Sequence, residues 1–162
     1  MRQKRPTSRL AVVLPFIGAL LLAAPTPATA SPYPLDQVLP QTAATRLGKM
    51  GIKTTSDLLK RGAKHKNRRK LAKKTGIELR KLEGWVRMAD VMRIKGVGPE
   101  MTRLLAAAGV KSVSKLRRER PGSLHKRLMA ANAKHKISGN PPSKAYVADW
   151  IKKAKRLRIV VR

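Results

Sequence analysis

The chain has 162 residues, enough for one domain or two very small ones. Its 38 Lys and Arg residues against 8 Asp and Glu give a formal net charge of +30. This charge predicts a polyanionic partner: nucleic acid, an acidic glycan, a cell-wall polymer or anionic lipid headgroups. The absence of cysteine excludes disulfides. The apolar residues recur periodically, so we expect a folded domain rather than a disordered basic tail.

The first thirty residues have the layout of a secretory signal peptide. Arg2, Lys4, Arg5 and Arg9 precede a mostly apolar run over 10–24, and an Ala-x-Ala cleavage pattern occupies 28–30. The run is shorter than the roughly 20 residues of a membrane-spanning helix. We therefore predict a secreted or periplasmic protein, cleaved near Ala30. The alternatives are an uncleaved N-terminal membrane anchor and, if this layout is misread, a cytoplasmic protein.

An imperfect internal repeat follows a short Pro-containing linker at 31–39. Residues 46–53 and 104–111 align 58 positions apart, which pairs Gly51 with Gly109. Further on the separation grows to 65 positions and pairs Trp85 with Trp150. Two copies of one unit can bury a core that neither buries alone. We predict a first, degenerate unit at 40–93, a second unit at 94–158 and a basic tail at 159–162.

The local patterns are helical in both units. Met101, Leu104, Leu105 and Ala108 recur at the spacing of one helix face, and no stretch keeps a period of two. Gly51 and Gly109 stand where helices need a left-handed C-terminal residue, and Ser143 is placed to cap the last helix. The sequence predicts an all-α protein of about seven to nine short helices, packed as one compact domain.

Between two predicted helices stands a glycine turn. Ile94, Gly96, Val97 and Gly98 match the apolar-x-Gly-apolar-Gly hairpin of the helix-hairpin-helix family, and Leu105 fits its later apolar position. Thr102 stands where that family usually has alanine. The resemblance implies sequence-independent binding of a nucleic-acid backbone through the N–H groups of the hairpin.

Elementary chemistry supports the same interpretation of the hairpin. Glycine tolerates positive φ, so successive N–H groups can point one way and form an anion nest. Gly98 as N-cap and Pro99 as the first helical residue predict a helix whose positive dipole end adds to the nest. The alternative is a tight turn that only packs helices closely, because a lone Gly-x-Gly is weak evidence. Val38, Leu39 and Pro40 replace the glycine turn in the first unit, so we expect that turn only to pack.

The repeated region also resembles an uncharacterised family, a domain of unknown function with two helix-hairpin-helix-like units. The segments 85–99 and 147–155 are the most characteristic, and the resemblance covers roughly 35–157. It implies a fold more than an activity.

Three basic runs accompany the hairpin. Residues 60–74 hold nine Lys or Arg and no acid, and further basic residues cluster at 115–127 and 152–162. A single basic run would be interpreted as a solvated surface that keeps the protein soluble. Three basic runs with almost no acidic residues among them favour a surface that binds a polyanion. The predicted nucleic-acid-binding residues are Lys64, Lys66, Arg68, Arg69, Lys70, Lys95, Gly96, Val97, Gly98 and Arg103.

Other side chains give little sign of chemistry. Trp85 and Trp150 occupy equivalent positions and are predicted to lie in the core, and no exposed stacking ring is evident, which favours duplex over single-strand binding. His65, His125 and His135 have no adjacent carboxylate. Asp90 and Asp149 are expected to pair with local Lys or Arg. We therefore predict no enzyme activity, cofactor, metal site or small-molecule substrate.

The leading hypothesis is an exported protein that binds duplex DNA without sequence preference, through hairpin amides and basic patches. The alternative is a cationic structural or interaction protein of the cell envelope that binds anionic wall polymers or lipid headgroups. In that case the hairpin is purely structural. Gly98 separates the two hypotheses, because backbone contact with phosphate depends on it and diffuse charge attraction does not.

Overall fold

The computed structural model describes residues 30–161, and all regular elements in that range are helical. They comprise one 3-10 helix and eight α-helices, which confirms the all-α prediction. None of these helices is long and apolar enough to cross a membrane. Apart from Ala30, the predicted signal peptide lies outside the described residues. The elements are η1 (Leu35–Gln37), α1 (Gln41–Gly48), α2 (Thr55–Gly62), α3 (His65–Thr75), α4 (Leu79–Val91), α5 (Pro99–Ala107), α6 (Val113–Leu116), α7 (Pro121–His135) and α8 (Lys144–Arg156).

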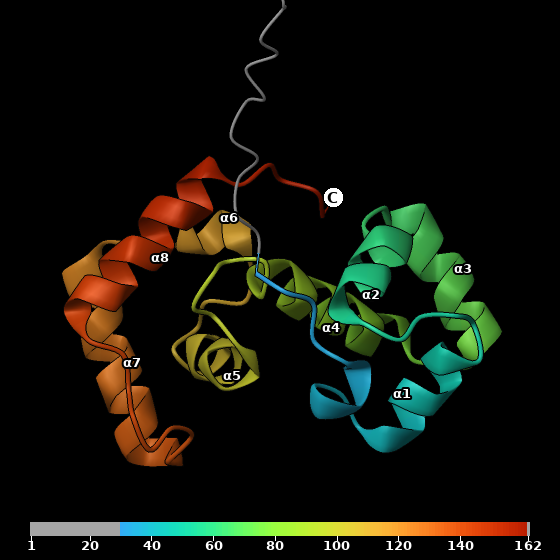
Figure 1. The fold of residues 1–162 in the computed structure, drawn as a ribbon, viewed down its shortest axis with the longest axis horizontal. Coiled ribbons are helices and arrows are strands. Elements are labelled where there is room, and N and C mark those ends of the chain that lie inside the picture. Colours follow the sequence, from blue (N-terminus) through green and yellow to red (C-terminus); the bar gives the residue numbers. More distant parts are fainter. Residues whose placement is uncertain (1–29, 162) are drawn as a thin grey trace, which may run out of the picture.

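Helix α4 connects two separate hydrophobic cores. Figure 1 shows it crossing the middle of the molecule, with α1, α2 and α3 on one side and α5 to α8 on the other. Its residues Leu82 and Val86 are fully buried in the first core, whereas Val91, near its end, belongs to the second. The single helix therefore fixes the two halves relative to each other.

The helix boundaries follow the sequence offsets. Helices α1 and α5 start 58 positions apart, and so do α2 and α6. Helices α4 and α8 start 65 positions apart, and each is 13 residues long. Gly51 and Gly109 end their turns at φ 72° and 85°, the left-handed conformation expected for both. Ser143 accepts a hydrogen bond from the Tyr146 N–H at 3.4 Å and caps α8 as predicted.

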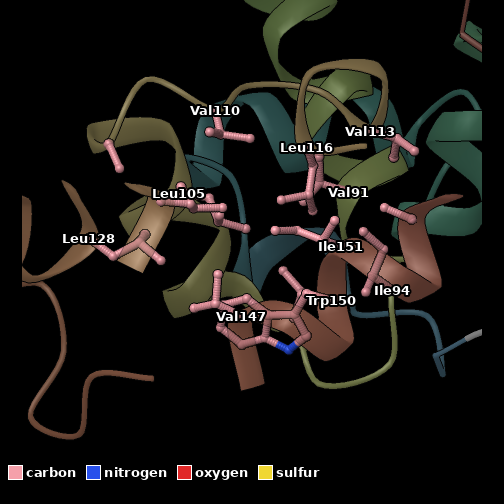
Figure 2. Close-up of a cluster of buried hydrophobic side chains, with 14 of the residues drawn as sticks. Val91, Ile94, Leu105, Val110, Val113, Leu116, Leu128, Val147, Trp150 and Ile151 are labelled. Carbon is pink, nitrogen blue, oxygen red and sulfur yellow. The ribbon is translucent and has the colours of Figure 1, made fainter. Parts of the chain in front are cut away.

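The second core contains the Trp150 side chain, which is 3% exposed (Figure 2). It packs with Val91, Ile94, Val147 and Ile151, so the prediction of a core tryptophan is confirmed there. Trp85 is only half-buried and packs against the margin of the first core. Trp85 and Trp150, which are equivalent in the repeat, therefore differ in how deeply their side chains are buried.

The segment 31–39 is not a linker. Leu35 and Leu39 are buried in the first core, and η1 forms between them. The Tyr33 N–H donates to Thr55 Oγ1 at 3.1 Å, and the Thr55 N–H donates to the Tyr33 carbonyl at 2.9 Å. The two prolines of this segment, Pro32 and Pro34, interrupt any longer helical period, which is why the sequence pattern did not reveal these two core residues.

Candidate nucleic-acid interface

Two buried side chains hold the glycine hairpin in place. Ile94 and Val97 are each 1% exposed, and the Val97 N–H donates to the Ile94 carbonyl at 2.9 Å, which closes the turn. Between them Gly96 adopts φ +95°, a conformation that L side chains rarely take. Gly98 instead has extended backbone, at φ −83° and ψ −173°. Only the first of the two glycines is therefore required by backbone conformation.

The start of α5 presents unpaired N–H groups. Within residues 30–161, no protein acceptor is found for the N–H groups of Gly98, Glu100 or Met101. The next N–H, of Thr102, donates to the Gly98 carbonyl at 2.9 Å, and the Thr102 hydroxyl donates to the same oxygen at 2.9 Å. These orphan donors and the helix dipole make the position attractive to an anion.

Trp150 lies directly beneath Gly96. A Cβ built on Gly96 would stand 3.1 Å from the indole Nε1, which is buried and has no hydrogen-bond partner among the described residues. Figure 2 shows this nitrogen at the edge of the hydrophobic cluster. Glycine at position 96 thus permits both the left-handed turn and the close approach of α8.

Tyr33 is a member of the site that sequence analysis missed. Its hydroxyl would stand 3.1 Å from a Cβ on Gly98, although the two residues are 65 positions apart. The backbone hydrogen bonds to Thr55 hold Tyr33 at the start of α2. No spacing rule could have found this residue, because the packing of the two halves brings it to the hairpin.

Basic side chains surround the hairpin. Lys95 and Arg103, both predicted site residues, are exposed on either side of Gly96 and Gly98. Lys153, from α8, donates through Nζ to the Lys95 carbonyl at 3.2 Å and pairs with Asp149 at 2.5 Å. The side chain of Val97, in contrast, is buried, and its N–H already donates to the Ile94 carbonyl, so Val97 offers a phosphate no free donor and its prediction as a binding residue is wrong. Lys153 is therefore a further cation at the site that sequence analysis did not assign.

The basic run of α3 forms a second, separate surface. Lys66, Arg69 and Lys70 line an open hollow of about 470 Å³ together with His65 and Lys73. Lys64 precedes this helix as its N-cap and is exposed. Helix α3 packs against α2 and α4 in the first half of the molecule (Figure 1), so the structure does not bring these cations to the hairpin.

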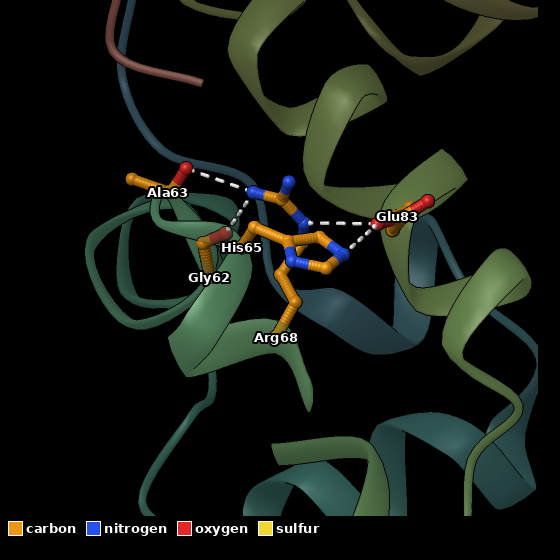
Figure 3. Close-up of polar contacts among 5 residues, drawn as sticks. All are labelled: Gly62, Ala63, His65, Arg68 and Glu83. Atoms are coloured by element: carbon orange, nitrogen blue, oxygen red, sulfur yellow. Dashed lines mark hydrogen bonds and ion pairs between the residues drawn. The ribbon is translucent and has the colours of Figure 1, made fainter. Parts of the chain in front are cut away.

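Arg68 does not belong to that surface. It is 4% exposed, and its Nη1 donates to the carbonyls of Gly62 and Ala63, both at 2.8 Å (Figure 3). Its Nε lies 3.5 Å from Glu83 Oε1. Arg68 closes the C-terminal end of α2, and its prediction as a nucleic-acid-binding residue is wrong. The run of basic residues gave no sign that position 68 is buried. Arg68 lies on the same inward face of α3 as Leu71, three residues later.

Five carboxylates of the described residues pair with nearby basic side chains: Glu78, Glu83, Asp90, Glu119 and Asp149. His65 Nε2 lies 3.4 Å from Glu83 Oε1, which corrects the expectation that no histidine has a carboxylate beside it. Asp90 and Asp149 pair with Arg93 at 2.6 Å and with Lys153, as predicted. Burial raises the pKa of Asp90, against the opposing hydrogen bond and charge of Arg93. In the part of the chain that the structure describes, no three His, Cys, Asp or Glu side chains form a cluster that could hold a metal.

Among residues 30–161 one aromatic ring is exposed, contrary to expectation. Tyr146, in the first turn of α8, is 64% exposed. A single ring can stack on one base, whereas single-strand platforms use several. It does not change the preference for a backbone site.

Fold and site together define a strongly basic, all-helical protein with two cores, one shared helix and a glycine turn followed by unpaired N–H groups. The chain belongs to the family DUF4332, a domain of unknown function, whose model matches residues 37–157. No curated protein and no solved structure matches the chain.

Proposed function

We propose that this protein binds the backbone of duplex nucleic acid without sequence preference, as a tandem helix-hairpin-helix-like protein. One observation carries the proposal: the N–H groups of Gly98, Glu100 and Met101, at the start of α5, have no acceptor within residues 30–161 and follow the exposed Lys95 and Gly96. A phosphate oxygen is an acceptor that fits such donors and the positive end of α5.

Side chains around the turn add to the proposed phosphate contact. Lys95, Arg103 and Lys153 supply positive charge, and the Tyr33 hydroxyl supplies a neutral donor. Glu100, in the first turn of α5, is exposed and opposes an anion there. Lys95 and Arg103 outnumber it, whereas the charge of Lys153 is already paired with Asp149, and water screens all these groups.

The α3 surface serves the same ligand in this proposal. Its cations lie in the other half of the molecule, so they contact a different stretch of backbone from the hairpin. Contacts of both kinds carry no base information, which is why the binding is independent of sequence. The first thirty residues supply the proposed export signal, and the site of action is then secreted or periplasmic.

The test compares duplex DNA affinity across a salt series for the wild type, Gly98→Val and Gly48→Val. Gly98 has extended backbone, and an added Cβ meets mainly the end of the Tyr33 side chain, so the variant is expected to fold. Gly48 is a matched control, because a Cβ there meets nothing within 4 Å. We expect Gly98→Val to weaken binding about tenfold at roughly physiological salt, as a hydrogen bond to a charged group predicts.

Equal affinity of both variants and the wild type, with a common salt dependence, would contradict the hairpin site. The charge would then act diffusely, and the envelope alternative, with anionic wall polymers or lipid headgroups as partners, would take its place. A circular dichroism spectrum of each variant shows whether a lost affinity reflects lost folding. Replacing Lys95 by Gln supplies an independent readout, since each lost phosphate contact reduces the salt slope by about 0.9.

A further inference from the structure

An apolar cavity of about 240 Å³ lies between α4 and α5, away from the glycine turn. Its deepest lining residues, Val91, Thr102 and Val110, are 1 to 2% exposed. Met88 and Ala106 form half-buried walls on the two helices. The cavity is thus built from both halves of the molecule.

The floor of this cavity offers no polar group to a ligand. Thr102 is the one residue there with a polar side chain, and its hydroxyl already donates to the Gly98 carbonyl at 2.9 Å. Water bound there would find too few hydrogen-bond partners, because a buried water typically makes about three. Only an apolar group fits this environment without losing hydrogen bonds.

Two cations stand at the mouth of the cavity. Arg87 and Lys111 are exposed and line it, and neither forms an ion pair with any carboxylate in residues 30–161. Gly84 completes the mouth, and a Cβ there would meet nothing within 4 Å, which keeps the entrance wide. An apolar hole beneath two unpaired cations is complementary to a molecule with a hydrocarbon chain and an anionic head.

We propose that this cavity binds a free, single-chain carboxylate, of the chemical class of a medium-chain fatty acid. The hydrocarbon chain lies between Met88 and Ala106, and the carboxylate pairs with Arg87 and Lys111. The long side chain of Met88 can adjust to the chain, since methionine fills irregular apolar space. None of its lining residues belongs to the turn at 94–98, and Thr102 connects the two sites through its hydrogen bond to the Gly98 carbonyl.

The first experiment is isothermal titration calorimetry of the full chain with octanoate and decanoate, below their micelle concentrations and at physiological salt. If the chain enters the cavity, each added methylene strengthens binding about fourfold, so decanoate binds about fifteenfold tighter than octanoate. Nonyltrimethylammonium has the same alkyl chain as decanoate and the opposite charge, and is expected not to bind. Equal affinity of octanoate and decanoate would overturn the proposal, because charge attraction alone does not depend on chain length.

Two variants test the cavity itself. Gly84→Leu and Ala106→Leu place bulk at the mouth from α4 and α5 respectively, and each is expected to weaken decanoate binding at least tenfold. The Met88 methyl signal in NMR should shift on decanoate addition in the wild type and not in these variants. Unchanged decanoate affinity in both folded variants would overturn the proposal.

A pair of charge variants completes the test. Arg87→Gln combined with Lys111→Gln removes the cations at the mouth, and Lys49→Gln combined with Lys152→Gln removes two exposed cations outside the cavity lining. We expect the first pair to weaken decanoate binding about tenfold and the second to leave it unchanged. Equal losses in both pairs would show a general charge effect and overturn the assigned site.

Anionic vesicles, added in place of decanoate, test whether the ligand is a membrane lipid. If the protein binds vesicles but not decanoate, and the cavity variants lose vesicle binding, a lipid replaces the free carboxylate as the ligand.

Discussion

The Tyr33 hydroxyl lies beside Gly98, at 3.1 Å from the position a Cβ on that glycine would take. Tyr33 enters from the N-terminal segment of the first half, and Gly98 starts the first helix of the second half. The contact therefore places a neutral hydrogen-bond donor next to the unpaired N–H groups of α5. No protein acceptor for this hydroxyl is found in the described part of the chain.

Tyr33→Phe is expected to weaken duplex DNA binding about tenfold, because a hydrogen bond to a charged phosphate is lost. The slope of log affinity against log salt should stay the same, since no charge is removed. Fluorescence anisotropy across a salt series measures both quantities. A Lys95→Gln variant provides the contrast, with a slope reduced by about 0.9.

Thermal unfolding separates this role from packing. The ring is kept in Tyr33→Phe, and both hydrogen bonds between Tyr33 and Thr55 use the main-chain N–H and carbonyl of Tyr33, so the unfolding midpoint should hardly move. A variant that binds DNA as the wild type does would remove Tyr33 from the proposed site and leave the hairpin amides in it.

Gly96→Ala is expected to destabilise the fold by about 1–2 kcal/mol, because an L side chain at φ +95° is strained and its Cβ would stand 3.1 Å from Trp150 Nε1. Gly98→Ala should cost less, since its backbone is extended and its neighbour is the mobile end of Tyr33. Urea unfolding of both variants measures the difference. Equal losses of stability would mean that the turn does not depend on the left-handed conformation of Gly96.

Much of this architecture could be predicted from sequence, because it rests on local rules. The offset that pairs Gly51 with Gly109 fixed the ends of two helices, since only glycine takes that left-handed conformation readily. Pro99 at the first turn of α5 located the start of that helix in the same way.

The rest depends on contacts between distant segments. Tyr33 reaches Gly98 and Glu83 reaches His65 only after the helices pack, and no periodicity encodes either contact. Arg68 is a residue whose burial the sequence pattern did not predict. An arginine within a run of basic residues is expected at the surface. The position of Arg68 on α3 instead directs its side chain toward the backbone carbonyls at the end of α2.

Arg68→Met is expected to destabilise the protein by about 2–3 kcal/mol. The change leaves the carbonyls of Gly62 and Ala63 without their donor inside the molecule, and unsatisfied buried acceptors cost about 1–3 kcal/mol. Arg69→Met, the matched control on the exposed face, should change the free energy of unfolding by less than about 0.5 kcal/mol. Urea unfolding measures both.

The same pair of variants should behave in the opposite way toward DNA. Arg69→Met removes an exposed cation and is expected to weaken binding, whereas folded Arg68→Met should bind as the wild type does. A loss of affinity in folded Arg68→Met, measured well below its unfolding midpoint, would contradict the structural role assigned to Arg68.

Two aspartates should give the stability of the protein opposite dependences on pH. The pKa of Asp57 is lowered, first by the hydrogen bond from the Thr54 side chain and further by backbone N–H groups, despite some desolvation. Its carboxylate closes a capping box at the start of α2. A lowered pKa means that this contribution is present above the unfolded value, near 3.8, and is lost as the pH falls through the folded pKa.

Asp90 acts in the other direction. Burial raises its pKa, so the folded state favours the protonated carboxyl, and its contribution is fully present below about 3.8 and is lost as the pH rises through the folded pKa. In the wild type, Asp90 makes the free energy of unfolding decrease as the pH rises, and Asp90→Asn should therefore reduce that decrease. Asp57 makes the free energy of unfolding decrease as the pH falls, and Asp57→Asn should reduce that decrease. Urea unfolding of the two variants and the wild type from pH 3 to 7 measures both slopes. If Asp90→Asn steepened the profile instead, the ion pair with Arg93, at 2.6 Å, would outweigh the cost of burying the carboxylate.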